Sequence, residues 1–519
     1  MKKYDIGITI GPIFDTVRDA STPAALWFAS SLFSDITRRI CQEVLKLKNY
    51  ENITIFSPYY SEEIRTDDGV GKFHDRIIFS LESRSVAGNE KEVLRSELQQ
   101  LVDKVKWETC DVFVQRILND SMREFLFQYL QISFVILERE AEEKQNCILT
   151  LSPYLDALEL MKTFPADQMQ NPIRRTFAGE KNNKNVYIKE SPLFARIQKA
   201  DNQFRKANGA IRSIEEIAAG AEAVNGKTSK YYAVIHADGD GMGKFLEGIG
   251  DEEISCFSKA CLSYAEEAAK RIIAFGGMMI YAGGDDLLFL APVADDTNKT
   301  VFEVCDEIRE LFQQKLLEQE SLKNRKNLPT ISFGIAIRYV KFPLYEALDA
   351  SRALLYQAKS LGGEKNRMAI DVQKHSGQSF GLAVSNLHCQ KMMEIVKSEK
   401  NTEQMDGAEV QSLLYTLGNM KVLLGVLSQD AKRGAMDCDG FVERWMNLFD
   451  NADQKGSKSY LEMSGRYYYQ YFLAPMSEEK IDAVILNPDG DVPESQQELS
   501  VFTTVLRMRK FLAEKEEEA

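Results

Sequence analysis

Apolar and polar residues alternate along the first part of the chain with two periods, one typical of strands and one of helices. Tyr4 to Ile10 alternates as a strand, and Pro23 to Leu45 carries apolar residues at helical spacing. Four further elements follow, predicted as strand, strand, helix and strand: Ile53 to Phe56, Arg76 to Phe79, Lys91 to Lys106 and Gln131 to Leu137. Strand, helix, two strands, helix, strand is the order of a ferredoxin-like α+β unit.

The same order of elements returns in the middle of the chain. A strand is predicted over Tyr231 to Ala237 and a helix over Glu252 to Ala274. Two strands joined by a Gly-rich connection, then a helix, a strand, a helix and a closing strand complete it: Met278 to Tyr281, Leu287 to Leu290, Thr297 to Glu318, Thr330 to Tyr339, Leu344 to Ser360 and Arg367 to Asp371. The chain therefore contains the predicted unit twice.

This pattern divides the chain into four segments, since 519 residues are too many for one hydrophobic core. We expect a first α+β domain over residues 1–165, a polar connector or small helical subdomain over 166–229, and a second α+β domain over 230–374. Residues 375–519 are mostly helical in pattern and predict a helical carboxy-terminal domain. The predicted fold class is α+β, with two ferredoxin-like domains and a helical domain.

The composition is that of an ordinary globular protein, with 44% hydrophobic and 27% charged residues. Lys and Arg number 64 against 78 Asp and Glu, a net charge of −14, which disfavours general binding to duplex nucleic acid or anionic membranes but leaves a local basic patch open. There are only four histidines, so a site that needs three or four of them in one domain is excluded.

The eight cysteines show no C-x-x-C pair and no Cys/His cluster at zinc spacing. We expect dispersed core thiols in a reducing compartment and no zinc site. The most apolar windows, such as Met278 to Leu290, have the length of strands and contain polar breaks, so we expect no membrane span. These features predict a soluble, cytoplasmic protein.

Two acidic clusters stand at the ends of strands that a ferredoxin-like sheet places side by side. Asp238-Gly239-Asp240 follows the first strand of the second unit, and Asp285-Asp286 lies in its hairpin. Converging carboxylates repel one another and raise each other's pKa unless a divalent cation neutralises them, and hard oxygen ligands select Mg²⁺ or Mn²⁺. A pair of such ions promotes in-line phosphoryl transfer. The glycines Gly283 and Gly284 allow a tight turn and the close approach of a nucleotide to the backbone.

The same residues also fit other kinds of structure. Asp-Gly-Asp-Gly and Gly-Gly-Asp-Asp are ordinary turn sequences, and either one alone favours a plain loop. Their joint placement, each after an apolar strand and one helix apart, favours a metal site. Lys244 is followed by Phe245 and not by Ser or Thr, which excludes a Walker loop, and an EF-hand beginning at Asp238 would place Ile249 at its bidentate Glu.

The motifs Ala237-Asp-Gly-Asp-Gly-x-Gly-Lys244 and Gly283-Gly-Asp-Asp286 resemble a known palm domain. It is shared by nucleotide cyclases of the GGDEF type and by the large, cyclic-oligoadenylate-making subunit of type III CRISPR effector complexes. The Asp-Asp ending, in place of Glu-Phe, favours the CRISPR polymerase. The resemblance is strong in the second unit and looser in the first, where Ile8-x-Ile-Gly-Pro12 and Leu26-Trp-x-Ala-Ser30 resemble the opening of the family's first palm.

The resemblance implies a role for each matching residue. Asp238, Asp285 and Asp286 would ligate two Mg²⁺ or Mn²⁺ ions, with the Gly239 carbonyl as a further ligand, and ATP would be the substrate. The nucleotide-binding positions would be Gly283, Gly284, Asp240, Lys244, Lys359 and Lys365. Lys359 and Lys365 would hold the triphosphate, although a solvated lysine at a helix end is an ordinary alternative. The implied reaction is attack of a ribose hydroxyl on an α-phosphate with release of pyrophosphate, repeated and closed into a ring.

The sequence also departs from the family. The family's large subunit often begins with an HD nuclease domain, which needs several His and Asp ligands, whereas the first 235 residues here contain only His74. We therefore expect no such nuclease. The first unit has no Gly-Gly-Asp-Asp, so we expect a catalytically silent palm that supplies an acceptor pocket, with Trp27 and Ser30 either lining it or packing in the core.

Three functions remain open from the sequence. The first is an ATP-dependent nucleotidyltransferase of antiviral defence. The second is a GGDEF-like cyclase that makes a cyclic dinucleotide from GTP, and the third is a nucleotide-binding scaffold without turnover. The partners would be nucleoside triphosphates, together with the guide RNA and backbone subunits of a type III complex, or further copies of the chain in a standalone homo-oligomer.

Overall fold

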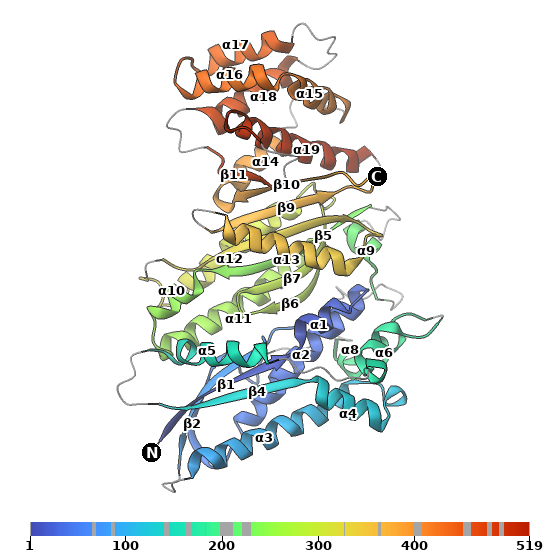
Figure 1. The fold of residues 1–519 in the computed structure, drawn as a ribbon, viewed down its shortest axis with the longest axis vertical. Helices are drawn as coiled ribbons and strands as arrows, with labels where there is room; N and C mark the ends of the chain where they lie inside the picture. Colours follow the sequence, from blue (N-terminus) through green and yellow to red (C-terminus); the bar gives the residue numbers. More distant parts are fainter. Residues whose placement is uncertain are drawn as a thin grey trace.

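The computed structural model describes most of the chain. The described residues are 2–64, 69–84, 89–139, 145–161, 168–181, 183–197, 211–220, 230–325, 327–361, 365–397, 407–449, 458–474, 480–486 and 492–517. Much of the expected connector, residues 198–210 and 221–229, lies outside them. Figure 1 shows two α+β domains and a helical part stacked along the long axis, with the second α+β domain in the middle.

The first domain is the predicted ferredoxin-like unit. Its main elements are β1 (Lys3–Gly11), α2 (Pro23–Val44), β2 (Tyr50–Ser57), β3 (Arg76–Ser83), α3 (Glu90–Glu108) and β4 (Gln131–Glu138). The strands form an antiparallel sheet in the order β2-β3-β1-β4. α2 begins where the Thr22 hydroxyl accepts a hydrogen bond from the Ala25 amide, and Pro23 opens its first turn.

Several helices of the first half were not predicted. They are α1 (Ile13–Arg18), α4 (Asp120–Tyr129) and α5 (Cys147–Leu160). Further helices lie in residues 166–229, for which a small helical subdomain was one of the two expectations: α6 (Pro172–Ala178), α7 (Val186–Glu190), α8 (Pro192–Arg196) and α9 (Ile214–Ala219). α5 follows β4 and packs against β1 and β4. Its amino-terminal cap, Asn146, also donates hydrogen bonds to the carbonyls of Leu246 and Ile249, at 2.6 and 2.9 Å, and so joins the first domain to the second.

The second domain repeats the unit. Its elements are β5 (Tyr231–Asp240), α10 (Met242–Glu247), α11 (Asp251–Ala274), β6 (Met278–Gly283), β7 (Asp286–Pro292), α12 (Val301–Leu317), β8 (Thr330–Tyr339), α13 (Leu344–Ser360) and β9 (Arg367–Gln373). The strand order β8-β5-β7-β6 is the same as β4-β1-β3-β2 of the first domain, and β9 adds parallel to β8. The fold class is therefore α+β with two ferredoxin-like domains, as predicted.

The boundary expected at residue 375 was wrong in one respect. β10 (Ser379–Ser385) pairs with β9 through a hairpin, and β11 (Ala483–Leu486) pairs with β10, so the sheet of the second domain has seven strands. The sequence pattern assigned Leu382 onward to a helix, because a short apolar run fits either element. This segment forms a strand because β9 offers an edge with unpaired backbone N–H and C=O groups, and pairing satisfies the hydrogen-bonding groups of both strands.

The remainder of the carboxy-terminal part is helical, as predicted. It contains α14 (Cys389–Lys397), α15 (Gly407–Asn419), α16 (Lys421–Lys432), α17 (Cys438–Phe449), α18 (Lys458–Tyr468) and α19 (Gln497–Glu517). Trp445 and Tyr468 are fully buried there, and the Trp445 indole donates to the Leu461 carbonyl at 3.0 Å. In the described part of the chain no single helix is long and apolar enough to cross a membrane; only the bent pair Val410–Asn419 and Lys421–Lys432 passes that test of length and composition.

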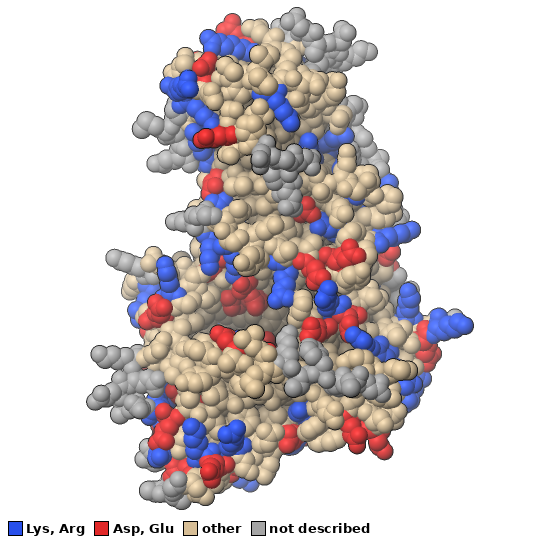
Figure 2. Space-filling model, viewed as in Figure 1, with Lys and Arg blue, Asp and Glu red and all other residues tan. Residues whose placement is uncertain are grey.

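The two α+β domains pack on each other reciprocally. α2 of the first contacts β6 of the second, and α11 of the second contacts β2 of the first. Residues of the second sheet such as Val234 and Ile280 belong to the same apolar cluster as Leu26 and Phe28 of α2. Figure 2 shows a hollow between the domains with acidic side chains on its walls and basic ones at its edge.

Candidate active site

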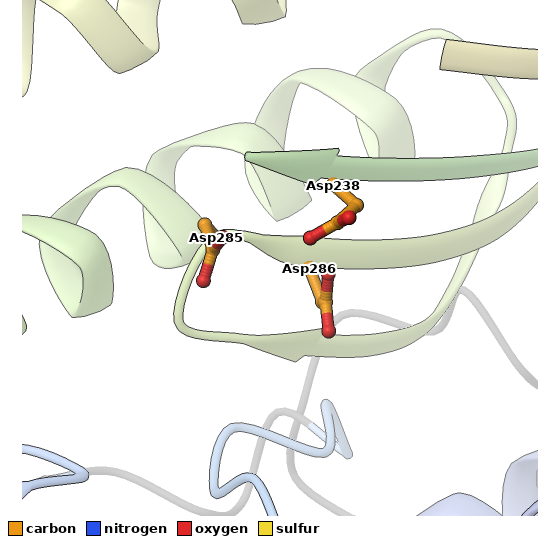
Figure 3. A group of neighbouring side chains, drawn as sticks. All are labelled: Asp238, Asp285 and Asp286. Carbon is orange, nitrogen blue, oxygen red and sulfur yellow. The ribbon is translucent and has the colours of Figure 1, made fainter. Parts of the chain in front are cut away.

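Three carboxylates meet at one edge of the second sheet. Asp238 lies near the end of β5, Asp285 lies in the turn between β6 and β7, and Asp286 opens β7. β5 and β7 are neighbours, and one oxygen from each carboxylate lies within 4.8 Å of the others (Figure 3). We call these three residues the acidic trio. The predicted convergence of Asp238 with the hairpin is present in the structure.

The hairpin that carries two members of the trio depends on its glycines. Gly283 pairs with Asp286, which leaves only Gly284 and Asp285 in the turn. Gly284 has a φ of 72°, a left-handed conformation that favours glycine. A Cβ on Gly283 would lie 2.1 Å from the Tyr281 hydroxyl oxygen, so that position accepts no side chain. These two glycines shape the turn, and their contact with a nucleotide stays a prediction.

Two carboxyl groups of the trio, those of Asp285 and Asp286, have raised pKa values. Loss of solvation, followed by the charge of Asp238, raises the pKa of Asp285 to about 6. The same two causes raise the pKa of Asp286 well above its usual value, and the charge of Asp285 adds to them. The Gly239 amide opposes the shift by donating to Asp285 Oδ2 at 3.2 Å. A divalent cation would relieve this repulsion, and a donor set made of carboxylate and carbonyl oxygens fits Mg²⁺ or Mn²⁺.

The structure also brings Lys359 to the trio. This residue lies in the last turn of α13, where its ammonium group forms an ion pair with Asp238 and donates to the Gly239 carbonyl at 2.7 Å. α13 is tied to β5 by the hydrogen bond between His236 Nδ1 and the Ser351 hydroxyl, at 2.7 Å. Lys359 and the Gly239 carbonyl therefore lie at the trio, and their roles toward a triphosphate and a metal ion stay predictions.

Asp240 has a different environment from its neighbours. It is only 3% exposed and accepts hydrogen bonds from the Thr330 hydroxyl at 3.0 Å, the Ser332 hydroxyl at 2.8 Å and the Asn366 amide at 2.9 Å. These bonds tie the end of β5 to β8 and to the segment before β9. All three bonds end on Oδ2, whereas Oδ1 is buried, has no hydrogen-bond partner among the described residues and lies 3.9 Å from the Lys359 ammonium. One oxygen of Asp240 is thus used within the protein, and contact of this residue with a nucleotide stays a prediction.

Within the described part of the chain, neither of the two remaining predicted lysines forms a hydrogen bond or ion pair with the trio. Lys244 is exposed on α10 and lines a surface pocket with Arg325 and Asn327. Lys365 is exposed just before Asn366, whose amide binds Asp240. Their role in holding a triphosphate stays a prediction.

The first domain contributes to this region through a segment that sequence analysis did not identify. Gly71 forms a β-bridge with Tyr281, and its carbonyl accepts a hydrogen bond from the Ala282 amide at 2.8 Å. The His74 ring approaches the turn, since its Cδ2 would lie 3.8 Å from a Cβ on Gly284. Burial lowers the pKa of His74 to about 4, so the ring is neutral at pH 7. No local motif marks this segment, because its partner is the hairpin some 200 residues away along the chain.

Trp27 and Ser30 lie at the contact between the two domains. The Trp27 indole is buried and donates to the Gly69 carbonyl at 2.6 Å. The Ser30 hydroxyl donates to the Ile280 carbonyl of β6 at 2.9 Å. Both residues therefore hold the Gly71 segment and α2 against the second sheet.

The first domain has an edge equivalent to the one that carries the trio. Gly11 in β1 pairs with the first residue of β4, and Asp240 in β5 pairs with the first residue of β8. Thr9, two residues before Gly11, therefore stands where Asp238 stands in the second domain.

The charges at this first edge differ from those of the trio. Arg76 is the first residue of β3, as Asp286 is of β7. Its guanidinium donates to both oxygens of Glu159 and to Asp156, all at 2.7 Å. Among the described residues the trio is the only group of three or more His, Cys, Asp or Glu side chains placed to hold a metal ion.

Comparisons with known proteins agree with this geometry. Residues 231–369 match the family model for the second palm domain of Cas10/Cmr2. The CRISPR system Cmr subunit Cmr2 of Pyrococcus furiosus is 32% identical over 184 residues, which are 30% of this chain and 20% of that protein. The match thus spans a fifth of the length of that relative.

Solved structures resemble the chain over almost its whole length. A chain of the type III-B Cmr-beta complex in the apo state has a TM-score of 0.56 at 12% identity, covering 98% of this chain and 82% of that one. A chain of a Csm1–Csm4 cassette in complex with pppApA has a TM-score of 0.53 at 13% identity, covering 99% and 69%. At these identities the likeness concerns the fold. Residues 231–369 are therefore similar to the second palm domain of Cas10/Cmr2, and the fold of the whole chain resembles that of the Csm1–Csm4 and Cmr-beta chains.

Proposed function

We propose that this chain is a two-metal nucleotidyltransferase that converts ATP into cyclic oligoadenylates, with release of pyrophosphate, in CRISPR-type antiviral defence. The observation that carries this proposal is the acidic trio, three carboxylates within 4.8 Å at the edge of a Cas10/Cmr2 palm. Retaining three mutually repelling acids, two of them with raised pKa values, is costly unless a cation binds them.

The roles of the residues follow from their places. Asp238, Asp285 and Asp286, with the Gly239 carbonyl, would hold two Mg²⁺ or Mn²⁺ ions. When bound, such ions neutralise charge on the phosphoryl group that is transferred. Lys359 stands at the trio on the last turn of α13, where its ammonium can turn from Asp238 to a phosphate.

The first palm would act as the silent partner. Arg76 stands at the position equivalent to Asp286 and is neutralised by Glu159 and Asp156, so a fixed guanidinium takes the place of a metal ligand there. The active edge would then be the one in the second palm, and the first would hold the nucleotide whose hydroxyl attacks. Two unlike palms in one chain also argue against a GGDEF-like cyclase, which pairs identical palms of two subunits.

The choice of ATP and of partners rests on the comparisons. Chains similar in fold come from a Csm1–Csm4 cassette in complex with pppApA or cA4, and from a Cmr-beta complex bound to cognate target RNA. By analogy we propose adenine nucleotides as substrates and a type III complex, with guide RNA and backbone subunits, as the setting. A standalone homo-oligomer is the alternative that the experiment below also covers.

The test is incubation of the purified chain with each nucleoside triphosphate in turn and Mn²⁺ or Mg²⁺, followed by mass spectrometry of the products. We expect cyclic oligoadenylate from ATP, and none from the Asp285→Ala/Asp286→Ala variant. Asp296→Ala, an exposed aspartate outside the trio, is the matched control and should keep full activity. Product from GTP alone would favour the cyclase, and no product even with target RNA and partner subunits would favour the scaffold.

A further inference from the structure

One exposed face of α13 carries basic and aromatic side chains that lead to the acidic trio. Arg352, Tyr356 and Lys359 are four and three residues apart, a spacing that places them on one side of a helix. Tyr356 is 74% exposed, which leaves a large aromatic face open three residues before Lys359. At 1.5 Å per residue, this face extends about 10 Å from Arg352 to Lys359.

The first palm extends this face across the boundary between the domains. The Arg352 guanidinium lies 4.1 Å from the centre of the Phe14 ring, which belongs to α1 and is 40% exposed. A second contact, between Arg18 and Asp349 at 3.6 Å, holds α1 against α13. We call Phe14, Arg352, Tyr356 and Lys359 the α13 strip. It runs from the silent palm to the carboxylates of the active one.

The chemistry of the strip suits a single-stranded oligonucleotide. Exposed aromatic rings offer faces on which bases stack, and guanidinium and ammonium groups contact the backbone phosphates. No acidic residue lies between Arg352 and Lys359, whereas Glu346 and Asp349 lie further back along the same helix. The part of α13 nearest the trio is therefore positive and aromatic in a protein with a net charge of −14.

We propose that the α13 strip binds the linear oligonucleotide as it grows, with one base stacked on Tyr356 and the backbone along Arg352. This inference rests on the proposed function, because it assigns a binding surface to the intermediate that precedes ring closure. On this proposal a mononucleotide seated at the trio leaves the face of Tyr356 to the base of a further nucleotide. The strip consequently distinguishes a chain of two or more nucleotides from ATP.

The test is the affinity of the full chain for a fluorescent 5′-triphosphorylated tri-adenylate. Its last nucleoside lacks both ribose hydroxyls, so the probe can neither extend nor close. Tyr356→Ala should weaken its binding about tenfold or more, the usual effect of losing a stacked base, while Tyr356→Phe keeps the ring and should bind within about twofold of the original. Tyr415→Ala is the matched control, since Tyr415 is 69% exposed on α15, remote from the trio.

A measurement of ATP affinity on the same variants distinguishes binding at the α13 strip from binding at the mononucleotide site. Tyr356→Ala should leave ATP binding within about twofold, and with active protein it should release shorter linear products. Equal weakening of ATP and of the tri-adenylate, or no weakening of either, would overturn the proposal. If tri-adenylate binding depends on Tyr356 but no nucleotide is turned over, the proposed enzyme activity is refuted and the binding role of the α13 strip stands. If nucleotides are turned over but tri-adenylate binding does not depend on Tyr356, the enzyme activity stands and the binding role of the strip is refuted.

Discussion

Lys359 forms an ion pair with Asp238 at the centre of the acidic trio and also donates to the Gly239 carbonyl at 2.7 Å. Its ammonium group thereby uses oxygen atoms that a divalent cation at the trio would need. Two cations close to the same carboxylate oxygen repel each other, so we expect metal binding at the trio to displace the Lys359 ammonium. The same movement would free the ammonium for a phosphate group.

Lys359→Met should therefore have opposite effects on two ligands. Without nucleotide, we expect Mn²⁺ to bind about tenfold more tightly, because a charged hydrogen bond no longer competes for Asp238. ATP should bind more weakly, since a phosphate contact is lost. Manganese titration by electron paramagnetic resonance checks the first effect. Lys365→Met removes an exposed lysine that forms no ion pair with the trio in the described structure, and it should leave Mn²⁺ affinity unchanged. An equally unchanged affinity in Lys359→Met would show that the ammonium does not compete.

The trio should also make the stability of the metal-free protein depend on pH. The pKa of Asp285 rises from its usual 3.8 to about 6 on folding, and that of Asp286 rises as well. Between these pH values the folded state binds more protons than the unfolded state, so the free energy of unfolding falls as the pH rises. The stability that Asp285 contributes is therefore present below about pH 4 and is lost as the pH rises through 6. Saturating Mn²⁺ should restore it.

Thermal unfolding at pH 4.5 to 7.5 in a chelating buffer measures this effect. Other carboxyl groups titrate in the same range, so the quantity of interest is the difference in Tm between the original chain and Asp285→Asn/Asp286→Asn. That difference should shift by a few degrees in favour of the variant as pH rises, and Mn²⁺ should reverse it. A difference that stays constant with pH would mean that the two carboxyl groups titrate normally.

The elements that a local pattern defines were predictable from the sequence. The strand Thr330–Tyr339 and the helix Leu344–Ser360 have the predicted bounds, because each carries a clear period and α13 follows Pro343. The approach of Asp238 to Asp285 also followed, since a ferredoxin-like order makes their strands neighbours. Features that depend on distant segments did not follow. Gly71 meets β6 only through the packing of the two palms, and the edge of β9 decides that β10 is a strand.

Asp240 lies within a motif, but its partners in the structure could not be predicted from that motif. The sequence placed it beside Asp238 as a ligand-binding carboxylate, whereas Thr330, Ser332 and Asn366 surround it in the structure. Two of these partners belong to β8 and the third precedes β9, so nothing within the Asp-Gly-Asp-Gly segment reveals them. Such a residue is better recognised by its burial than by its motif.

Asp240→Ala should accordingly destabilise the protein. Three donors would lose their acceptor in a buried site, a change that costs about 2–4 kcal/mol. The expected result is a lower Tm with Mn²⁺ affinity at the trio kept within about threefold in the folded protein. Asp296→Ala removes an exposed aspartate and should leave the Tm unchanged. A normal Tm combined with lost ATP binding would instead place Asp240 among the nucleotide ligands.

Gly71 should couple the first domain to the hairpin that carries Asp285 and Asp286. A Cβ at this position would lie 2.7 Å from the Ser30 hydroxyl oxygen, which donates to the Ile280 carbonyl. Gly71→Ala should push the segment away from β6, lower the Tm and reduce turnover, because the hairpin loses its contact with the first palm. Gly418→Ala is the control, since a Cβ there meets open space.

A double-mutant cycle isolates the cause. Ser30→Ala alone removes one hydrogen bond and should cost about 1 kcal/mol, but it also removes the atom that blocks a side chain at position 71. Gly71→Ala/Ser30→Ala should therefore be more stable and more active than the sum of the single changes predicts, with a coupling of about 1 kcal/mol or more. If the free-energy changes of the two single variants simply add, the alanine at position 71 does not clash with the Ser30 hydroxyl. The contact of Ser30 with β6 would then not set the position of the hairpin.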